Sequence, residues 1–285
     1  MSKRSIRRMG WRLAVLFAVG LSACSSVGTR LGDDLASGIA NHDDPRTVAE
    51  ALPAYLVLLD GLLSSRPDNA SMLRAAADLY GLYAGSFAVE PERSRQLSDR
   101  AWRYARAAAC ATQRDWCTAL DGPVDAFVEV IAGADQDEVP QLFNLAAAWT
   151  TYIRAHGDDF RAIAALPKAQ ALIVRVTELD PDYRDGMPFV YLGVLHSLRP
   201  AALGGRPDLG LEAFQRAIAA SNGTNLMAMT LQAEFHARLV FDREEHDALI
   251  DRVLASEAQA PGMTLSNVLA KRRAQELKDE ADDYF

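Results

Sequence analysis

Apolar residues recur at intervals of three and four along almost the whole chain after the first 45 residues. In the segment 47–65, for example, Val48, Leu52 and Leu56 fall on one face of a helix, which has 3.6 residues per turn. No run alternates apolar and polar residues between turn-forming pairs, which is the pattern of a half-buried strand. The sequence therefore predicts an all-α fold.

Proline, glycine, asparagine and aspartate separate the expected helices. The helices are expected at 47–65, 71–89, 91–110, 124–132, 138–156, 158–179, 188–198, 209–220, 225–240, 242–256 and 264–281. Pro53 is expected either to kink the first helix or to mark its true first turn, and Pro167 is expected to divide 158–179 into two helices. The segment 199–208, which contains two prolines and two glycines, is predicted to be a loop.

Similar turns recur between pairs of these helices, which suggests a helical repeat. Pro67 and Pro181 match the terminal proline of the tetratricopeptide repeat, and Gly210, Phe214 and Ala217 match its small, aromatic, small spacing. Only some positions of the tetratricopeptide pattern are matched. The match predicts a tetratricopeptide-like superhelix of helical hairpins with additional helices, in which stacked pairs leave a concave surface.

The N-terminus has the parts of a secretory signal peptide: a basic region, a short apolar core at 13–21, and small residues before a cysteine. The core is too short to span a bilayer, which needs about 20 residues. Leu21-Ser22-Ala23-Cys24 resembles the lipobox of bacterial lipoproteins, in which the cysteine is acylated and becomes the first residue of the mature protein. The alternative is an ordinary signal peptide with an incidental cysteine.

This interpretation divides the chain into three parts: a lipoprotein signal peptide at 1–23, a glycine-containing flexible tether at 24–45, and a helical body at 46–285. The tether has room for one short helix, around 31–40. No second apolar run of transmembrane length is expected. The body is therefore predicted on the periplasmic side of the cell envelope, attached to the membrane through lipidated Cys24. Because serine rather than aspartate follows that cysteine, the outer membrane is expected.

The charge of the body excludes some partners. Without the five basic residues of the signal, 25 Lys and Arg remain against 38 Asp and Glu, a net charge of −13. Nucleic acid is not expected as a partner, because binding phosphates requires clustered cations. Extended contact with anionic lipid headgroups is disfavoured for the same reason.

The two remaining cysteines, Cys110 and Cys117, are close in sequence. Since exported proteins occupy an oxidising compartment, a disulfide that closes a small loop is predicted. The alternative is two separately buried thiols. A metal site is not expected, because no histidine or third cysteine lies nearby in the sequence.

Motifs of catalysis are not found. The sequence has no phosphate-binding loop, no His-Glu-x-x-His and no serine in the glycine context of a nucleophile elbow. The carboxylates are spread along helices, as solubilising residues are, and His236 and His246 are interpreted as parts of solvated faces. We therefore expect no enzyme, no catalytic residues and no cofactor. An enzyme whose site is assembled from distant residues stays open as a rival class.

Several segments, in this order, resemble one family, the T component (TatT) of tripartite ATP-independent periplasmic (TRAP) transporters. They are Leu52-Pro53-Ala54-Tyr55-Leu56, Tyr80-Gly81-Leu82-Tyr83-Ala84-Gly85, Ala148-Trp149, His156-Gly157-Asp158-Asp159-Phe160, Glu178-Leu179-Asp180-Pro181-Asp182-Tyr183, Pro200-Ala201-Ala202-Leu203-Gly204-Gly205-Arg206-Pro207 and Ala281-Asp282-Asp283-Tyr284-Phe285. The resemblance implies a periplasmic lipoprotein with tetratricopeptide-like helices, an internal hydrophobic pore or cleft, and a homotrimeric assembly. It also implies that the protein binds the TRAP solute-binding subunit and helps to deliver a ligand, which could be hydrophobic. The alternative is a lipoprotein scaffold that holds another envelope complex.

Four aromatic residues are candidates for lining such a cleft. Tyr80 and Tyr83 are three residues apart, as are Trp149 and Tyr152, so each pair shares a helix face. Aromatic side chains suit a site that must hold apolar surface and also offer a polar tip. The alternative is that all four are repeat-packing residues, which is also how Trp102 is interpreted.

Overall fold

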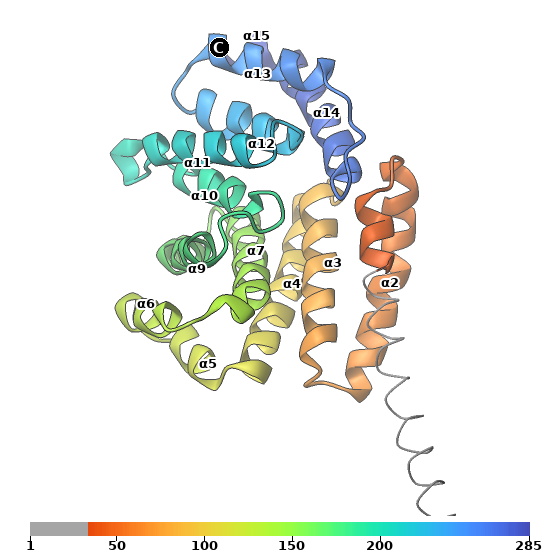
Figure 1. The fold of residues 1–285 in the computed structure, drawn as a ribbon, viewed down its shortest axis with the longest axis vertical. Helices are drawn as coiled ribbons and strands as arrows, with labels where there is room; N and C mark the ends of the chain where they lie inside the picture. Colours follow the sequence, from red (N-terminus) through yellow and green to blue (C-terminus); the bar gives the residue numbers. More distant parts are fainter. Residues whose placement is uncertain (1–33) are drawn as a thin grey trace, which may run out of the picture.

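The structure is a computed structural model that describes residues 34–285. Within this range the regular elements are helices and no strand is present (Figure 1), which confirms the predicted all-α fold. The α-helices are α2 (Pro45–Ser65), α3 (Ala70–Ser86), α4 (Pro91–Thr112), α5 (Arg114–Leu120), α6 (Val124–Ala132), α7 (Val139–Ala155), α8 (Phe160–Ala164), α9 (Leu166–Leu179), α10 (Met187–Ser197), α11 (Pro207–Ala220), α12 (Leu226–Leu231), α13 (Arg243–Ala255), α14 (Thr264–Asp279) and α15 (Ala281–Tyr284). Short 3₁₀ turns lie at η1 (Gln136–Glu138) and η2 (Ala201–Leu203), and η3 (Gln232–Ala237) is a π-helix. The predicted signal peptide and Cys24 lie outside the described residues.

Helix starts follow from local chemistry. Side chains that accept a hydrogen bond from a first-turn backbone N–H satisfy groups that would otherwise be unpaired; they are Asp44, Asn69, Asp159, Asn225 and Asp242. Pro167 lies in the first turn of α9, directly after the break from α8, so the predicted division of 158–179 into two helices is confirmed. Pro53 lies inside α2 and so does not mark its first turn.

Two elements differ from the sequence-based expectation. The short helix α5 was not predicted, because its seven residues hold too weak a periodic signal; burial of Trp116 against the body stabilises it. The helix predicted at 225–240 changes after Leu231 from α to π geometry. Gln232 and His236 in the π-helix both bond to Glu245, at 2.8 and 3.1 Å, a tertiary contact that no periodicity in the sequence records.

Helices that follow one another in the chain pack side by side (Figure 1). The sequence of contacts runs from α2 to α3, α4, α7, α9, α10 and α11. The inner face of α4 carries Ala101, Ala105 and Ala108, all fully buried. Because alanine is small, α3 and α7 can approach this face closely. This leaves the opposite face of α4 free for larger side chains.

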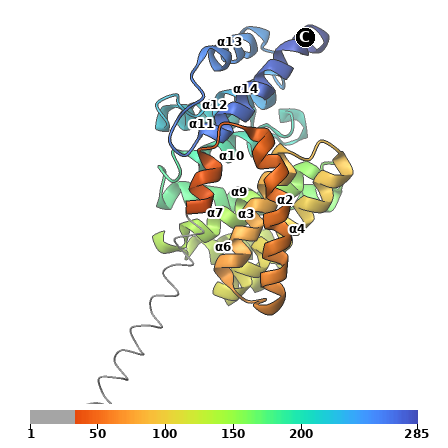
Figure 2. The same ribbon diagram turned by 90° about the vertical axis from the view of Figure 1, so that its right-hand side faces the viewer.

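The C-terminal helices α12, α13 and α14 have a separate small core. A third apolar cluster joins α14 to α2 through Leu265, Leu269, Val48 and Leu52 (Figure 2). Ile39 packs on this cluster, and the backbone N–H of Gly262 donates to the Asn41 side chain at 2.7 Å.

The described part of the predicted tether therefore differs from a flexible linker. Residues 34–40 are helical and the segment up to α2 lies against the folded body. The apolar contact of Ile39 with the α2–α14 cluster is the physical reason.

Among the described residues, α2 is long and apolar enough to cross a membrane by length and composition alone. This helix contradicts the expectation that no second apolar run of transmembrane length exists. Length and composition do not distinguish a span from a packed core helix, and Leu52, Leu56 and Leu63 of α2 are buried in the body. Val57 on the same helix is 71% exposed.

Candidate functional site

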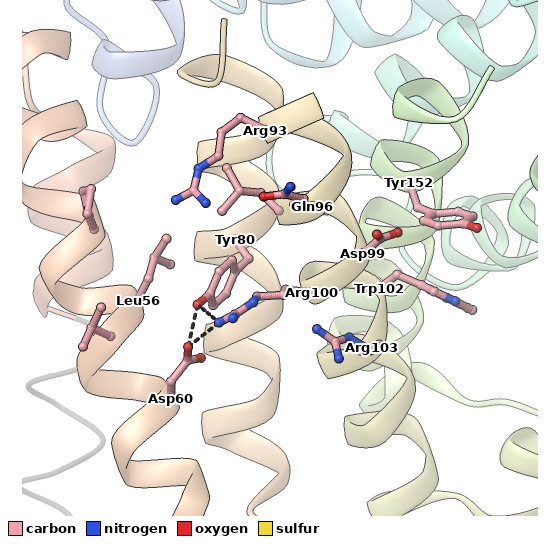
Figure 3. A pocket seen from close by; sticks show the side chains of 13 residues that line it. Leu56, Asp60, Tyr80, Arg93, Gln96, Asp99, Arg100, Trp102, Arg103 and Tyr152 are labelled. Atoms are coloured by element: carbon pink, nitrogen blue, oxygen red, sulfur yellow. Dashed lines mark hydrogen bonds and ion pairs between the residues drawn. The ribbon is translucent and has the colours of Figure 1, made fainter. Parts of the chain in front are cut away.

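A cleft of about 760 Å³ opens over the outer face of α4. Its volume lies in the range typical of ligand sites. Figure 3 shows Leu56 and Asp60 of α2 on one side, Tyr152 of α7 on the other, and side chains of α4 between them. Tyr80 reaches the cleft from α3.

The floor of the cleft is set by the spacing of residues along α4. Arg93, Gln96, Arg100 and Arg103 are separated by three, four and three residues, so they share one face of the helix. The alanine face points the other way, into the core. Three arginines lie on this helix face, and Asp60 and Asp99 line the cleft with them, so the cleft carries both signs of charge with one more cation than anion.

Asp60 is the centre of a hydrogen-bonded network at one edge of the cleft. The hydroxyl of Tyr80 donates to Asp60 Oδ2 at 2.8 Å, and the hydroxyl of Tyr104 donates to Oδ1 at 2.6 Å. Arg100 Nη1 also donates to Oδ2, at 2.6 Å (Figure 3). The carboxylate thus has three donors from two other helices.

The two tyrosines of this network keep their protons well above neutral pH. Burial, followed by the hydrogen bond to Asp60, raises the pKa of Tyr104 to about 12. The same two causes, in the same order, raise the pKa of Tyr80. Both hydroxyls therefore act as donors to the carboxylate across the physiological range.

Arg93 and Arg103 differ from Arg100. Both are exposed, and neither forms an ion pair or side-chain hydrogen bond with another residue in the range 34–285. Asp99, between them on the helix, lies 3.3 Å from His156 Nε2. The cleft therefore presents two uncompensated guanidinium groups to solvent.

Two of the four predicted cleft aromatics border the cleft: Tyr152, which is partly exposed, and Tyr80, which is itself only 3% exposed and bonds through its hydroxyl to Asp60. Trp149 does not: it is 5% exposed and lies behind Trp102, with the two rings stacked at 4.4 Å. Tyr83 packs on Phe87 at 6.0 Å, next to the α2–α14 cluster. Trp102, interpreted from the sequence as packing only, lines the cleft.

The arginines and Asp60 were missed by sequence reasoning. The signal for the arginines was present, because their spacing places them opposite the alanines of α4. No sequence signal could have paired Asp60 with Tyr104, which is 44 positions away.

A second group of polar side chains lies where α3 meets α7, and we call it the α3–α7 polar cluster: Arg74, Asp78, Gln141, Asn144 and Arg184. Asn144 Nδ2 donates to Asp78 Oδ1 at 2.7 Å and to the backbone oxygen of Arg74 at 3.1 Å. The buried atoms Asn144 Oδ1 and Gln141 Nε2 have no partner among the described residues. Burial raises the pKa of Asp78, against the opposing effect of Arg184 at 3.9 Å.

A strained turn positions Arg184 in this cluster. Arg184 and Asp185 have φ values of 47° and 55°, and Gly186 follows at 75°. Left-handed backbone is costly for residues with a Cβ. The turn places the Arg184 guanidinium 5.3 Å from the centre of the Phe143 ring, a cation–π contact.

The predicted cysteine pair is bonded in the structure. Cys110 and Cys117 form a disulfide with an S–S distance of 1.99 Å, which connects the last turn of α4 to α5. Within residues 34–285, no three or more His, Cys, Asp or Glu side chains are grouped so as to hold a metal ion.

Comparison with known proteins agrees with the resemblance read from the sequence. The chain is 22% identical over 271 residues to an uncharacterized protein of Treponema pallidum (strain Nichols), an alignment that covers 88% of this chain and 84% of the relative. Residues 41–285 match the family described as TRAP transporter T-component. The match spans the whole helical body, including the cleft, the polar cluster and the C-terminal helices. The chain therefore belongs to the TRAP transporter T-component family.

Proposed function

We propose that this protein is a lipid-anchored T component that binds the solute-binding subunit of a TRAP transporter on the periplasmic side of the envelope. The family match over residues 41–285 is the observation that carries the proposal. The lipobox that ends at Cys24 supports an anchored location, and the cleft over α4 supports a binding role.

The cleft also supports a ligand that has an apolar part. Leu56, Val57 and Trp102 contribute apolar surface to it, beside the polar tips of Tyr80 and Tyr152. Charged and amide side chains, among them Arg93, Gln96 and Asp99, line the cleft beside these apolar groups and could orient such a ligand. The family resemblance further favours a homotrimer with tetratricopeptide-like hairpins, which belongs to the same proposal.

Affinity purification tests the central claim. A tagged full-length protein, extracted from native membranes in mild detergent, is expected to copurify with the TRAP solute-binding subunit. The two purified proteins should then bind each other in a titration. Absence of binding between the pure proteins would overturn the proposed partner, whatever else copurifies.

The anchor is tested separately. Fatty-acid labelling in growing cells is expected to mark the wild-type protein and not Cys24→Ala, which should be released or misprocessed. Incorporation of the label into Cys24→Ala would refute lipidation at this residue. Membrane fractionation is expected to place the wild type in the outer membrane, and recovery from the inner membrane alone would contradict that location.

A further inference from the structure

We infer that the cleft over α4 is a docking groove for an acidic, amphipathic segment of a partner protein. The inference deepens the proposed function, because the solute-binding subunit is the partner it would apply to. It rests on two free cations near the ends of the groove and on the apolar side chains between them.

The two uncompensated cations define the ends of the groove. Arg93 and Arg103 are ten residues apart on one straight helix, which corresponds to about 15 Å at 1.5 Å per residue. Both side chains are exposed and without an ionic partner among the described residues. In a chain whose net charge without the signal is −13, such a pair favours a partner with two separated negative charges.

The centre of the groove holds charged side chains that have local partners and an apolar strip beside them. Arg100 lies between the two free arginines, but Asp60 compensates its charge at 2.6 Å, and Asp99 lies 3.3 Å from His156 Nε2. Val57 faces this region with 71% of its surface exposed, and Pro53, Leu56, Leu97 and Trp102 also line it. Because Trp102 is stacked on buried Trp149, its ring is held in place and can serve as an anchor.

The groove therefore carries a free cation near each end of its α4 wall and, between them, apolar side chains beside the partnered carboxylates Asp60 and Asp99. Its complement carries a negative charge at each end and apolar side chains between, as two acidic residues ten positions apart on an amphipathic helix provide. An amphipathic helix laid into a groove between helices is a recurring recognition mode that matches these dimensions.

A charge-reversal pair tests the groove. Arg93→Glu with Arg103→Glu changes both ends, and Arg114→Glu with Arg252→Glu is the matched control. The control arginines are exposed, lie outside the groove and form no ion pair with a described residue. The full-length protein in detergent is titrated with two probes: a fluorescent helical peptide carrying two glutamates ten residues apart with leucines between them, and the TRAP solute-binding subunit.

The groove variant is expected to weaken binding of both probes by about tenfold or more, and the control by about threefold or less, because only the former reverses the complementary charges. Wild-type affinity should fall as salt is raised. Thermal melts should show all variants folded, since the substituted arginines have no partner to lose. Equal losses in the two variants, or none in either, would overturn the groove as the docking site.

The two probes separate this inference from the proposed function. If the subunit binds the groove variant as tightly as the control, the inference fails and the T-component proposal stands. If the subunit does not bind the wild type, the proposed function fails, and the peptide alone decides whether the groove takes acidic segments. Binding of dodecanoate in place of the peptide, lost in the groove variant, would overturn the inference in favour of a small amphiphilic anion.

Discussion

The cleft and the α3–α7 polar cluster each contain an aspartate among arginine and aromatic side chains, yet the two carboxylates accept different numbers of hydrogen bonds. Asp60, at the cleft, has a side chain that is 29% exposed and accepts three short hydrogen bonds. Asp78, in the cluster, is 42% exposed and accepts one, with Arg184 no nearer than 3.9 Å. The number of donors that reach a carboxylate, more than its exposure, decides how well the fold accommodates its charge.

Asp78 illustrates the point further. Its side chain is the more accessible of the two, but desolvation by the surrounding protein raises its pKa. The unpaired atoms of Gln141 and Asn144 lie on the neighbouring helix. The cleft edge is thus a satisfied network, and the polar cluster is an incompletely satisfied one, the more costly arrangement in a folded protein.

The largest effect is expected beneath the cleft. Trp149→Ala removes a buried ring that stacks on Trp102 and contacts the edge of Phe127, and should lower the free energy of unfolding by about 3–5 kcal/mol. Tyr152→Ala, a partly exposed lining residue on the same helix, should cost less than half as much. Denaturant titrations of both variants make the measurement. Similar costs for the two would remove the distinction between packing and lining aromatics.

Next in size is the loss of Asp60. Asp60→Ala leaves the hydroxyls of Tyr80 and Tyr104 and the guanidinium of Arg100 without their shared acceptor, at a cost of about 2–3 kcal/mol. Tyr80→Phe, which removes one donor to Asp60 and one acceptor of Arg100 but leaves the carboxylate in place, should cost about 1 kcal/mol. In Asp60→Ala the pKa of Tyr104 should also fall from about 12, because the carboxylate helps to raise it. An ultraviolet titration that leaves this pKa unmoved would show that the network is not as described.

A smaller loss is expected in the polar cluster. Asn144→Ala removes hydrogen bonds to Asp78 and to the Arg74 backbone, but also removes the unpaired Oδ1, so the net cost should be about 1–2 kcal/mol. Asn144→Asp serves as the comparison, because it places a second carboxylate beside Asp78. It should be more destabilising than alanine at pH 7. Denaturant titration showing the reverse order would indicate that the cluster is not crowded with negative charge.

The smallest expected effect is a gain in stability rather than a loss. Because the folded protein raises the pKa of Asp78, its charge destabilises the fold at pH 7, and stability is regained as pH falls through the folded-state pKa towards the unfolded value near 3.8. Asp78→Asn should therefore be at least as stable as the wild type at pH 7, and the difference should vanish in acid. Asp208 is the control, since Arg206 lowers its pKa to about 2. Asp208→Asn should give no stabilisation at pH 7. A gain in stability equal to that of Asp78→Asn would contradict the contrast between the two aspartates.

The sequence was most informative where local chemistry sets the structure. The helix predicted at 124–132 coincides with α6, which follows Pro123 and ends before Gly133. Local patterns could not predict α5, which is stabilised by burial of Trp116, nor the π-helix η3, whose side chains meet Glu245 across the C-terminal helices.

The site was half predictable for the same reason. Aromatic spacing included Tyr80 and Tyr152 among its candidates, but it could not distinguish Tyr152 from Trp149, because which face of α7 is covered depends on Trp102 of another helix. The arginine stripe of α4 could be read from its spacing opposite the alanines. The Asp60 network could not, since it exists only once α2, α3 and α4 are packed together.

The cluster that joins α2 to α14 has a mechanical consequence. The helix at 34–40 and α2 are the first described helices, and Ile39, Val48 and Leu52 tie them to Leu265 and Leu269 near the other end of the chain. A force applied to the N-terminal segment therefore acts directly on the C-terminal helices through these apolar contacts. The contacts between α2 and α14 must break before the helices can unfold one after another, so the protein should withstand a larger force at its N-terminus than a simple row of helices would.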